Sequence, residues 1–158
     1  MQKYHIEGGY PLKGTVKASG NKNAALPCLA AALLTDEPVL LKNIPEIEDT
    51  HVMLDILKVL GAIIEKKRDN EYSITANTIV THEMPVEESR KVRASILFAG
   101  PLLARTGNVV LPPPGGDVIG HRRLDTHFHA FKSLGAQVEI DGIFQVKATK
   151  LTGDDIFL

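Results

Sequence analysis

The sequence predicts a mixed α/β (α+β) fold made of two copies of one unit: a buried helix, a strand, an amphipathic helix and a hairpin. Residues 24–34 are apolar all round, as is much of the stretch 92–103, and a helix without a polar face belongs inside a core. Residues 50–60 and 124–131 each carry one apolar stripe, followed by two short strand-like segments. The 158 residues suit one domain or a piece of a larger protein.

Caps and turns set the limits of these elements. Asp49 or Thr50 can cap the first striped helix, and Gly61 and Gly135 stand where the two striped helices should stop. Asp141-Gly142 is a suitable turn for the second hairpin. The predicted strands are residues 39–41, 63–65, 72–74, 109–111, 137–140 and 144–147.

The two copies align at an offset of about 70 residues. Leu33-Leu34 matches Leu102-Leu103, 69 residues on, whereas residues 60–62 match residues 134–136, 74 residues on. The extra residues of the second copy fall in a stretch that contains the loop at 112–117, Pro-Pro-Pro-Gly-Gly-Asp. An insertion in one copy of a repeat is commonly a loop with a function, although a longer surface loop can also simply be tolerated.

Composition excludes several classes of protein. The net charge is −1 with both signs spread along the chain, so no basic surface for nucleic acid or anionic membrane is expected. No apolar run approaches the roughly 20 residues that span a bilayer, and the start of the chain lacks the apolar core of a secretory signal. Cys28 is the only cysteine, and we expect it to fill space in the core of a cytoplasmic protein.

The first candidate site is the segment 18–23, which leads into the first buried helix. Free backbone N–H groups and the helix dipole make such a junction suitable for an anion, and Lys22 adds a full charge. Asn23 can cap the helix or hydrogen-bond a ligand. The local pattern alone favours the simpler interpretation, a polar turn with a solvated lysine.

The second candidate is Arg93, at the start of the other buried helix. A guanidinium beside buried surface needs an anionic partner or a water-filled cleft. A phosphate or carboxylate ligand would serve. An internal ion pair with Glu87 or Glu88 would serve as well, and the sequence slightly favours it.

The third candidate is the glycine loop, residues 115–125. Its glycines allow backbone to approach a ligand and the loop to move, and Asp117 can exchange a proton with a substrate or cap a turn. As a phosphate-binding loop the pattern is weak, because it lacks the Gly-Lys-Ser/Thr ending. His127 and His129 face different directions on a helix, so we expect no metal site.

Together these segments resemble one family. Residues 19–27 (SGNKNAALP) are similar to the Ser-Gly-x-Lys-Asn-Ala-Ala-Leu-Pro opening of the UDP-N-acetylglucosamine enolpyruvyl transferases. Residues 92–95 (VRAS) resemble the Met/Val-Arg-Ala-Ser segment of that family, and residues 114–122 (PGGDVIGHR) resemble its Pro-Gly-Gly-Cys-x-Ile-Gly-x-Arg loop. The similarity runs in register from about Tyr4 to Leu158. Three motifs in order are specific, whereas each alone would be weak.

The resemblance implies an inside-out α/β barrel built from βαβαββ repeats, of which about two of the three repeats of one domain are present. Repeat one would span about 17–80, repeat two about 86–150, and residues 151–158 would start repeat three within a partial domain at 17–158. Residues 1–16 would pack with a second domain. The apolar end of the chain, Ile156-Phe157-Leu158, fits a chain that continues.

The resemblance also implies a reaction. The enolpyruvyl group of phosphoenolpyruvate moves to the 3-hydroxyl of UDP-N-acetylglucosamine, and phosphate is released, as the first committed step of peptidoglycan synthesis. Lys22 and Asn23 would hold phosphoenolpyruvate, with Lys22 also neutralising the leaving phosphate, and Asp117 would be the proton donor. No cofactor is implied. The residues implied to contact the nucleotide sugar are Arg93, Arg122, Arg123, Leu124, Asp125 and Thr126.

Asp117 departs from the common pattern, because most members of the family have cysteine there. An aspartate near its reference pKa of about 3.9 is ionised at neutral pH. Substrate phosphate or desolvation would raise the pKa of Asp117, and Arg122 and Arg123 would lower it. The sequence leaves the balance of these effects open.

Two other functions compete with this one. The sister enzyme, enolpyruvylshikimate-phosphate synthase, shares the fold and phosphoenolpyruvate, but it typically has Lys-Ser where this chain has Lys22-Asn23. A non-catalytic module that keeps the fold is the other alternative. The catalytic base and the opposing domain would lie beyond Leu158, so we expect the isolated chain to have no transferase activity.

The aspartate leads to a first prediction. We expect the full-length protein to escape covalent inactivation by fosfomycin, an epoxide that alkylates the cysteine common at this position. Mass spectrometry of the treated protein, alongside an activity assay, measures this. An added mass at Asp117 together with lost activity would contradict the prediction.

Overall fold

The computed structural model describes residues 3–116, 120 and 123–157, and within these ranges it confirms the two hairpins and the two striped helices. The same order of elements occurs twice. In chain order the elements are α1 (Lys22–Ala31), a 3-10 turn η1 (Ala32–Leu34), β1 (Val39–Lys42), α2 (Glu48–Val59), β2 (Ile63–Arg68), β3 (Glu71–Thr75), α3 (Val86–Lys91), a 3-10 helix η2 (Arg93–Phe98), α4 (Ala99–Thr106), β4 (Asn108–Leu111), α5 (Asp125–Ser133), β5 (Gln137–Asp141) and β6 (Ile143–Lys147).

Each copy forms its own three-stranded antiparallel sheet. The strand orders are β1-β3-β2 and β4-β6-β5, so the last strand of each copy lies in the centre of its sheet. Val39 pairs with Ile74 in the first sheet, and Val109 pairs with Val146 in the second. The hairpin turn at Gly142 and the helix ends at Gly61 and Gly135 have positive φ angles, as the turn chemistry predicts.

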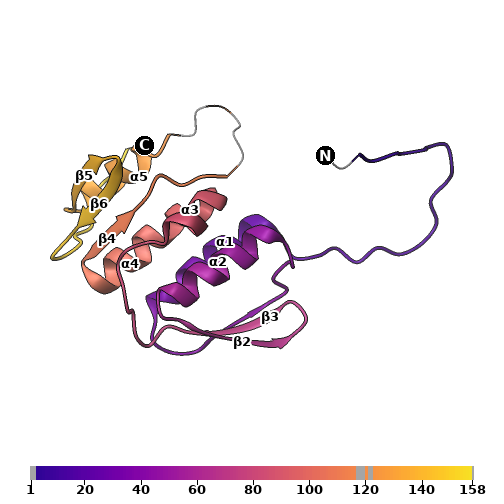
Figure 1. Cartoon of the computed structure of the whole chain (residues 1–158), viewed down its shortest axis with the longest axis horizontal. Coiled ribbons are helices and arrows are strands. Elements are labelled where there is room, and N and C mark those ends of the chain that lie inside the picture. The colour runs from indigo at the N-terminus through magenta and orange to yellow at the C-terminus, as the bar shows by residue number, and fades with distance from the viewer. Residues whose placement is uncertain (1–2, 117–119, 121–122, 158) are drawn as a thin grey trace.

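Helices occupy the space between the two sheets. Figure 1 shows α1 beside the segment that runs from α3 to α4, with the first sheet on one side and the second sheet on the other. The side chains that fill this interior are fully buried and include Leu29, Leu33, Met53, Ile56, Phe98 and Leu102. Within the described ranges, none of the helices has the length and apolar character needed to span a bilayer.

The second inner helix is not the single helix that residues 92–103 predict. Val92 has an extended backbone, with φ −133° and ψ 128°, which separates α3 from η2. Pro101 has no N–H, so it cannot donate to the carbonyl of Leu97, and the α-helical pattern starts only at Ala99. The segment is therefore a short helix, a 3-10 helix and a second short helix.

The first inner helix buries only one of its two apolar faces. Leu26, Leu29 and Leu33 are buried, whereas a stripe of small apolar residues on the opposite side is exposed. The prediction that Cys28 fills the core is wrong, because its side chain lies on this exposed stripe. The stripe consists of Ala24, Pro27, Cys28 and Ala31.

The opening strand of the implied βαβαββ repeat is almost absent. In the second copy it is one parallel bridge between Glu83 and Val110. In the first copy, residues 3–19 run away from the body without helix or strand (Figure 1). Their large apolar side chains are 75–99% exposed and lack partners within the described ranges: Tyr4, Ile6, Tyr10, Leu12 and Val16.

Arg105 ties the two copies together at the end of α4. Its Nη1 donates to the carbonyl of Leu33 at 2.8 Å, and its Nη2 donates to the carbonyl of Ala76 at 3.1 Å. Both acceptors belong to the first copy, where η1 and β3 end. One partly buried guanidinium thus fixes the ends of three segments.

Arg105→Lys should lower the free energy of unfolding by about 1.5–3 kcal/mol, because a lysine cannot reach both carbonyls with the planar fork of arginine. Urea denaturation of the chain measures this. Arg68→Lys is the matched control, since Arg68 is exposed and forms no side-chain hydrogen bond or ion pair among the described residues. Equal stability of the two variants would show that the tie contributes nothing.

Candidate functional site

Lys22 stands at the very start of α1 rather than before it. Asn21 caps the helix, because its Oδ1 accepts a hydrogen bond of 3.1 Å from the backbone N–H of Ala24. The prediction that the helix starts at Ala24, with Asn23 as a possible cap, is therefore wrong by two residues. Lys22 and Asn23 occupy the first two helical positions with exposed side chains, where backbone N–H groups are free of intrahelical partners.

The ammonium of Lys22 has a protein partner. Its Nζ forms an ion pair with Oδ2 of Asp49, a residue of the first turn of α2. The side chains are 48% and 28% exposed, so the pair is open to solvent and to a ligand. Lys22 is therefore an exposed lysine with an ion-pair partner, and the starts of α1 and α2 lie together.

Hydrogen bonds hold the segment that carries Asp49. The buried hydroxyl of Thr50 lies 2.6 Å from the carbonyl of Pro45 and 2.7 Å from that of Ile47. Its oxygen also accepts from the N–H of Ile47 at 3.3 Å. This closes the turn before α2.

Glu46 connects the same turn to the first hairpin. Its Oε1 accepts a hydrogen bond of 2.9 Å from the Tyr72 hydroxyl and forms an ion pair of 2.9 Å with Lys66. The hydrogen bond from Lys66, and then that from Tyr72, lower the pKa of Glu46. Burial first, and then the bond to the carboxylate, raise the pKa of Tyr72. Lowering the pH through the pKa of Glu46 therefore weakens this connection.

Arg93 begins η2 and reaches toward the far end of the glycine loop. Its Nη2 donates to the carbonyl of Arg123 at 3.1 Å. The alternative of an ion pair with Glu87 or Glu88 is wrong, because the described structure has no ion pair between Arg93 and either glutamate. Below Arg93, the hydroxyl of Ser95 donates to the carbonyl of Ser89 at 3.1 Å and fixes the bend between α3 and η2.

The stem of the glycine loop is bound to the same bend. The N–H groups of Gly115 and Gly116 donate to the carbonyls of Ser89 and Arg90, each at 3.1 Å. A Cβ on Gly115 would lie 1.6 Å from the Arg90 carbonyl oxygen. The described glycines of the stem thus allow close approach to protein backbone, whereas the sequence suggested approach to a ligand. Asp117 and Arg122 lie outside the described residues.

Four predicted residues meet around one hollow of about 400 Å³. Its wall contains Arg93, Arg123, Leu124 and Asp125. Arg123 Nε donates to Oδ1 of Asp125 at 3.1 Å within an exposed ion pair. Thr126, the last residue of the predicted sugar-binding stretch, is exposed on α5 and does not line the hollow.

Sequence reasoning missed the apolar side of this hollow. Pro113, Pro114, Ile140, Phe128 and Phe144 complete its wall, and the rings of Phe128 and Phe144 pack with centroids 4.8 Å apart. A hollow lined by two cationic side chains and several apolar ones suits a ligand with an anionic group and a ring. The apolar spacing of α5 was a usable signal for Phe128, but Phe144 arrives from a hairpin sixteen residues later.

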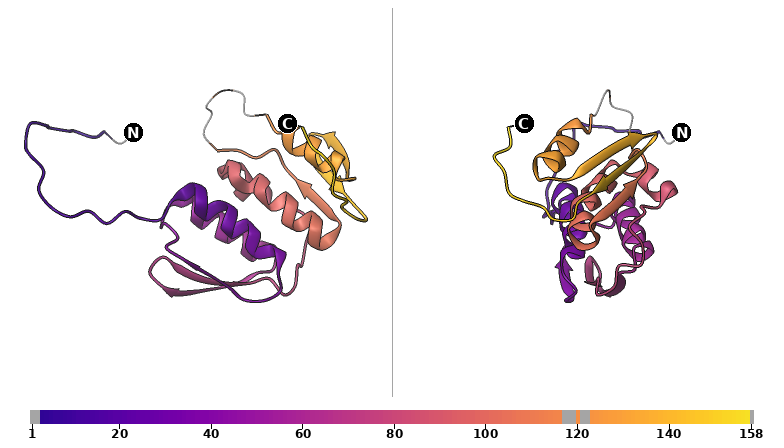
Figure 2. Two further views of the ribbon diagram at one scale, coloured as in Figure 1. Left: turned by 180° about the vertical axis from the view of Figure 1, so that it is seen from behind. Right: turned by 90° about the vertical axis from the view of Figure 1, so that its left-hand side faces the viewer.

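The two inner helices start at the same end of the molecule. Figure 2 shows the beginnings of α1 and of the α3–η2 segment on one side, with the described stem that follows β4, residues 112–116, at that end. Lys22 is the first residue of α1, and Arg93 is the first residue of η2. The described stem of the loop and the helix entrance therefore do not lie on opposite faces.

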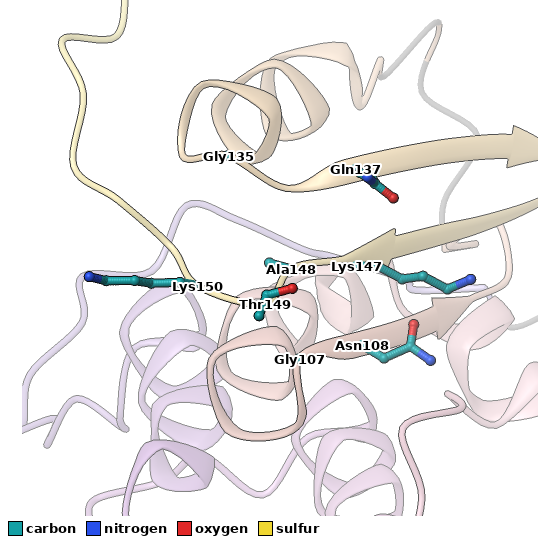
Figure 3. Close-up of a pocket in the computed structure, with 8 residues that line it drawn as sticks. All are labelled: Gly107, Asn108, Gly135, Gln137, Lys147, Ala148, Thr149 and Lys150. Atoms are coloured by element: carbon teal, nitrogen blue, oxygen red, sulfur yellow. The ribbon is translucent and has the colours of Figure 1, made fainter.

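A second hollow, of about 520 Å³, lies where the chain leaves β6. Lys147 and Lys150 both line it, but their side chains point away from one another (Figure 3). Asn108 contributes a buried Oδ1 without a hydrogen-bond partner in the described structure. The polar groups of this hollow do not converge on a common point, so it is a weaker candidate than the first.

Comparison with known proteins now identifies the family. The model of the family "EPSP synthase (3-phosphoshikimate 1-carboxyvinyltransferase)" matches residues 6–156, nearly the whole chain. The chain belongs to the EPSP synthase family. Both motif-bearing helix starts and the glycine loop fall within the matched range.

Curated relatives within this family carry a different name. Over all 158 residues the chain is 60% identical to a UDP-N-acetylglucosamine 1-carboxyvinyltransferase of Treponema denticola and 58% identical to one of Treponema pallidum. It is 50% identical to one of Bradyrhizobium diazoefficiens over 156 residues. The chain spans 37% of the length of the two Treponema relatives and 36% of the third.

Two solved structures share the fold. The enolpyruvyl transferase NikO from Streptomyces tendae matches with a TM-score of 0.78 at 24% identity, over 92% of this chain and 32% of that one. An EPSP synthase from Acinetobacter baumannii matches with a TM-score of 0.66 at 16% identity, over 89% of this chain and 33% of that one.

Gly115→Ala should lower the free energy of unfolding by about 1–3 kcal/mol, because the added methyl group collides with the Arg90 carbonyl and the stem must move. Gly153→Ala is the control: its Cβ would meet no atom within 4 Å, and we expect a change below about 0.5 kcal/mol. Chemical denaturation compares the two. A Gly115→Ala variant as stable as the control would mean that this contact is not maintained in solution.

Proposed function

We propose that the full-length protein containing this chain transfers the enolpyruvyl group of phosphoenolpyruvate to the 3-hydroxyl of UDP-N-acetylglucosamine and releases phosphate. The observation that carries the proposal is the 60% identity, across the whole chain, to a relative named for this activity. The arrangement of the site supports it, because a lysine, two arginines and the described stem of the glycine loop gather at one end of the inner helices.

Each predicted residue has a role in this proposal. Lys22, with Asn23 beside it at the start of α1, holds the phosphate and carboxylate of phosphoenolpyruvate. The hollow between Arg93 and Phe128 receives part of the nucleotide sugar. The remaining proposed contacts to the sugar nucleotide come from Arg122, Arg123, Leu124, Asp125 and Thr126.

The reaction proceeds by addition and elimination. The 3-hydroxyl of the sugar gives its proton to a general base of the full-length protein, and its oxygen forms a bond to C2 of phosphoenolpyruvate while C3 gains a proton. This gives a tetrahedral ketal that still carries phosphate. The bond between C2 and the phosphate oxygen then breaks, and C3 loses a proton. Asp117 supplies the proton to C3, and Lys22 stabilises the charge of the departing phosphate.

The rest of the molecule completes the site in this proposal. The exposed stripe of α1 is covered by a third repeat that begins at about residues 151–158, closing an inside-out barrel with repeats at about 17–80 and 86–150. Residues 1–16, in which the large apolar side chains of the described residues are exposed, pack on a second domain. Because these parts lie outside it, the isolated chain is inactive.

The proposed cellular setting follows from the two substrates. UDP-N-acetylglucosamine and phosphoenolpyruvate are cytoplasmic metabolites, so the protein acts in the cytoplasm. Its product enters peptidoglycan synthesis and therefore serves wall formation, cell shape and division. The protein needs neither a metal nor another cofactor for this chemistry.

Phosphate release by the full-length protein tests the activity. We expect release with UDP-N-acetylglucosamine as acceptor and none with shikimate 3-phosphate, the acceptor of the enzyme after which the family is named. Asp117→Ala should lower kcat about 100-fold or more, as loss of a general acid does. Asp69→Ala, an exposed turn residue, is the control. Undiminished turnover without Asp117 would exclude the proposed proton donor, and turnover with shikimate 3-phosphate alone would replace the proposed function.

A further inference from the structure

We propose that Asp49 is the positioning residue for Lys22: its carboxylate holds the ammonium at the start of α1, where the ammonium meets the phosphate of phosphoenolpyruvate. This inference rests on the proposed function. Asp49 entered the sequence argument only as a possible helix cap, and in the structure it is the ion-pair partner of Lys22.

The position of the pair follows from two helix starts that lie together. Lys22 is the first residue of α1, and Asp49 is the second residue of α2. The pair is 48% exposed on the lysine side and 28% exposed on the aspartate side. The aspartate is thus the more enclosed partner, and the ammonium presents the more open side.

Electrostatics explains why Lys22 needs such a partner. The start of a helix carries a partial positive charge, which repels an ammonium and attracts a carboxylate. A lone lysine on its flexible stem would therefore turn away from the start of α1 into solvent. Asp49 is attracted to the start of its own helix and supplies the charge that keeps the ammonium there. An ammonium has three donors, so the contact with Asp49 leaves donors for phosphate.

Both partners stand on backbone that is fixed. The turn before Asp49 is closed by the Thr50 hydroxyl and connected to the first hairpin through Glu46. On the Lys22 side of the pair, Gly20 packs against the residue that follows β1, since a Cβ on Gly20 would be 1.8 Å from the carbonyl oxygen of Asn43. The segments at 20–22 and 43–49 therefore touch next to the ion pair, and neither can move without the other.

A competing role for Asp49 predicts the opposite effect of its removal on the binding of phosphoenolpyruvate. A carboxylate on the ammonium could act as a placeholder that phosphate must displace, and its removal would then strengthen the binding of phosphoenolpyruvate. A positioning carboxylate does the reverse, because its removal frees the ammonium and costs the ordering of a flexible side chain at each binding event.

Kinetics of the full-length protein distinguish the two roles. For Asp49→Asn we expect kcat/KM for phosphoenolpyruvate to fall about 10–100-fold, as misplacement of a binding group does, with KM for UDP-N-acetylglucosamine unchanged within about twofold. Asp49→Glu should recover part of the loss because it restores the charge. Glu48→Gln is the control: it removes a charge from the same turn, and Glu48 forms no ion pair among the described residues. Thermal unfolding confirms that each variant is folded.

A second measurement does not depend on activity. Brief acylation of amines followed by peptide mass spectrometry should label Lys22 several-fold faster in Asp49→Asn than in the wild type, and no faster in Glu48→Gln. Lys58, which pairs with Asp55 at 2.8 Å, is the internal reference. Unchanged labelling of Lys22, or tighter binding of phosphoenolpyruvate by Asp49→Asn, would overturn the inference. A wild-type protein without transferase activity would instead remove the proposed function, while the labelling still tests the ion pair.

Discussion

The packing of α1 beside the η2–α4 segment decides where every other part of this molecule lies. Each copy sends one apolar helical segment into the interior, and Leu29, Leu33, Phe98 and Leu102 fill the space they share. The two segments start at the same end of the molecule (Figure 2), so the residues at their starts lie on one side. The sheets cover the outside of this pair, and Arg105 ties the opposite end.

The sequence was a good guide wherever burial and turn chemistry act locally. The apolar helices, the striped helices and the two hairpins lie where their periodicity and their glycines place them. Periodicity could not reveal that Val92 is extended or that a 3-10 helix precedes Ala99, because these depend on a bend fixed by tertiary hydrogen bonds. Pro101 was the one local signal of that break.

The exposed stripe of α1 shows why an apolar helix can mislead. An all-apolar sequence predicts that both faces of the helix avoid water, but the described residues bury only one of them. Cys28 was therefore expected in the core and lies on the surface. The candidate site also depends on contacts that the sequence does not reveal. The family resemblance implies a shared site for Lys22, Arg93 and the glycine loop, whereas the ion pair of Lys22 with Asp49 joins residues 27 positions apart and has no sequence signature.

The two copies also repeat one backbone contact, and this repetition explains the placement of the site. In the first copy, Gly20 before α1 meets the carbonyl of Asn43 after β1. In the second copy, Gly115 after β4 meets the carbonyl of Arg90 before η2. In the first copy the glycine precedes the helix, and in the second copy it follows the strand. In both copies, however, the segment that leaves the strand crosses the backbone just before the inner helix, and the glycine lies at this crossing.

Each crossing stands next to one cation. Lys22 opens α1 two residues after Gly20, and Arg93 opens η2 three residues after Arg90. Since a side chain at either crossing would push the segments apart, a glycine is required on one partner in each copy. The inner helices can then present both cations at one end, and the described stem of the inserted loop lies at the second crossing. The site therefore depends on the repeat. The same close contact between a glycine and a backbone carbonyl occurs in each copy, and together the two contacts place Lys22 and Arg93 at the same end of the molecule.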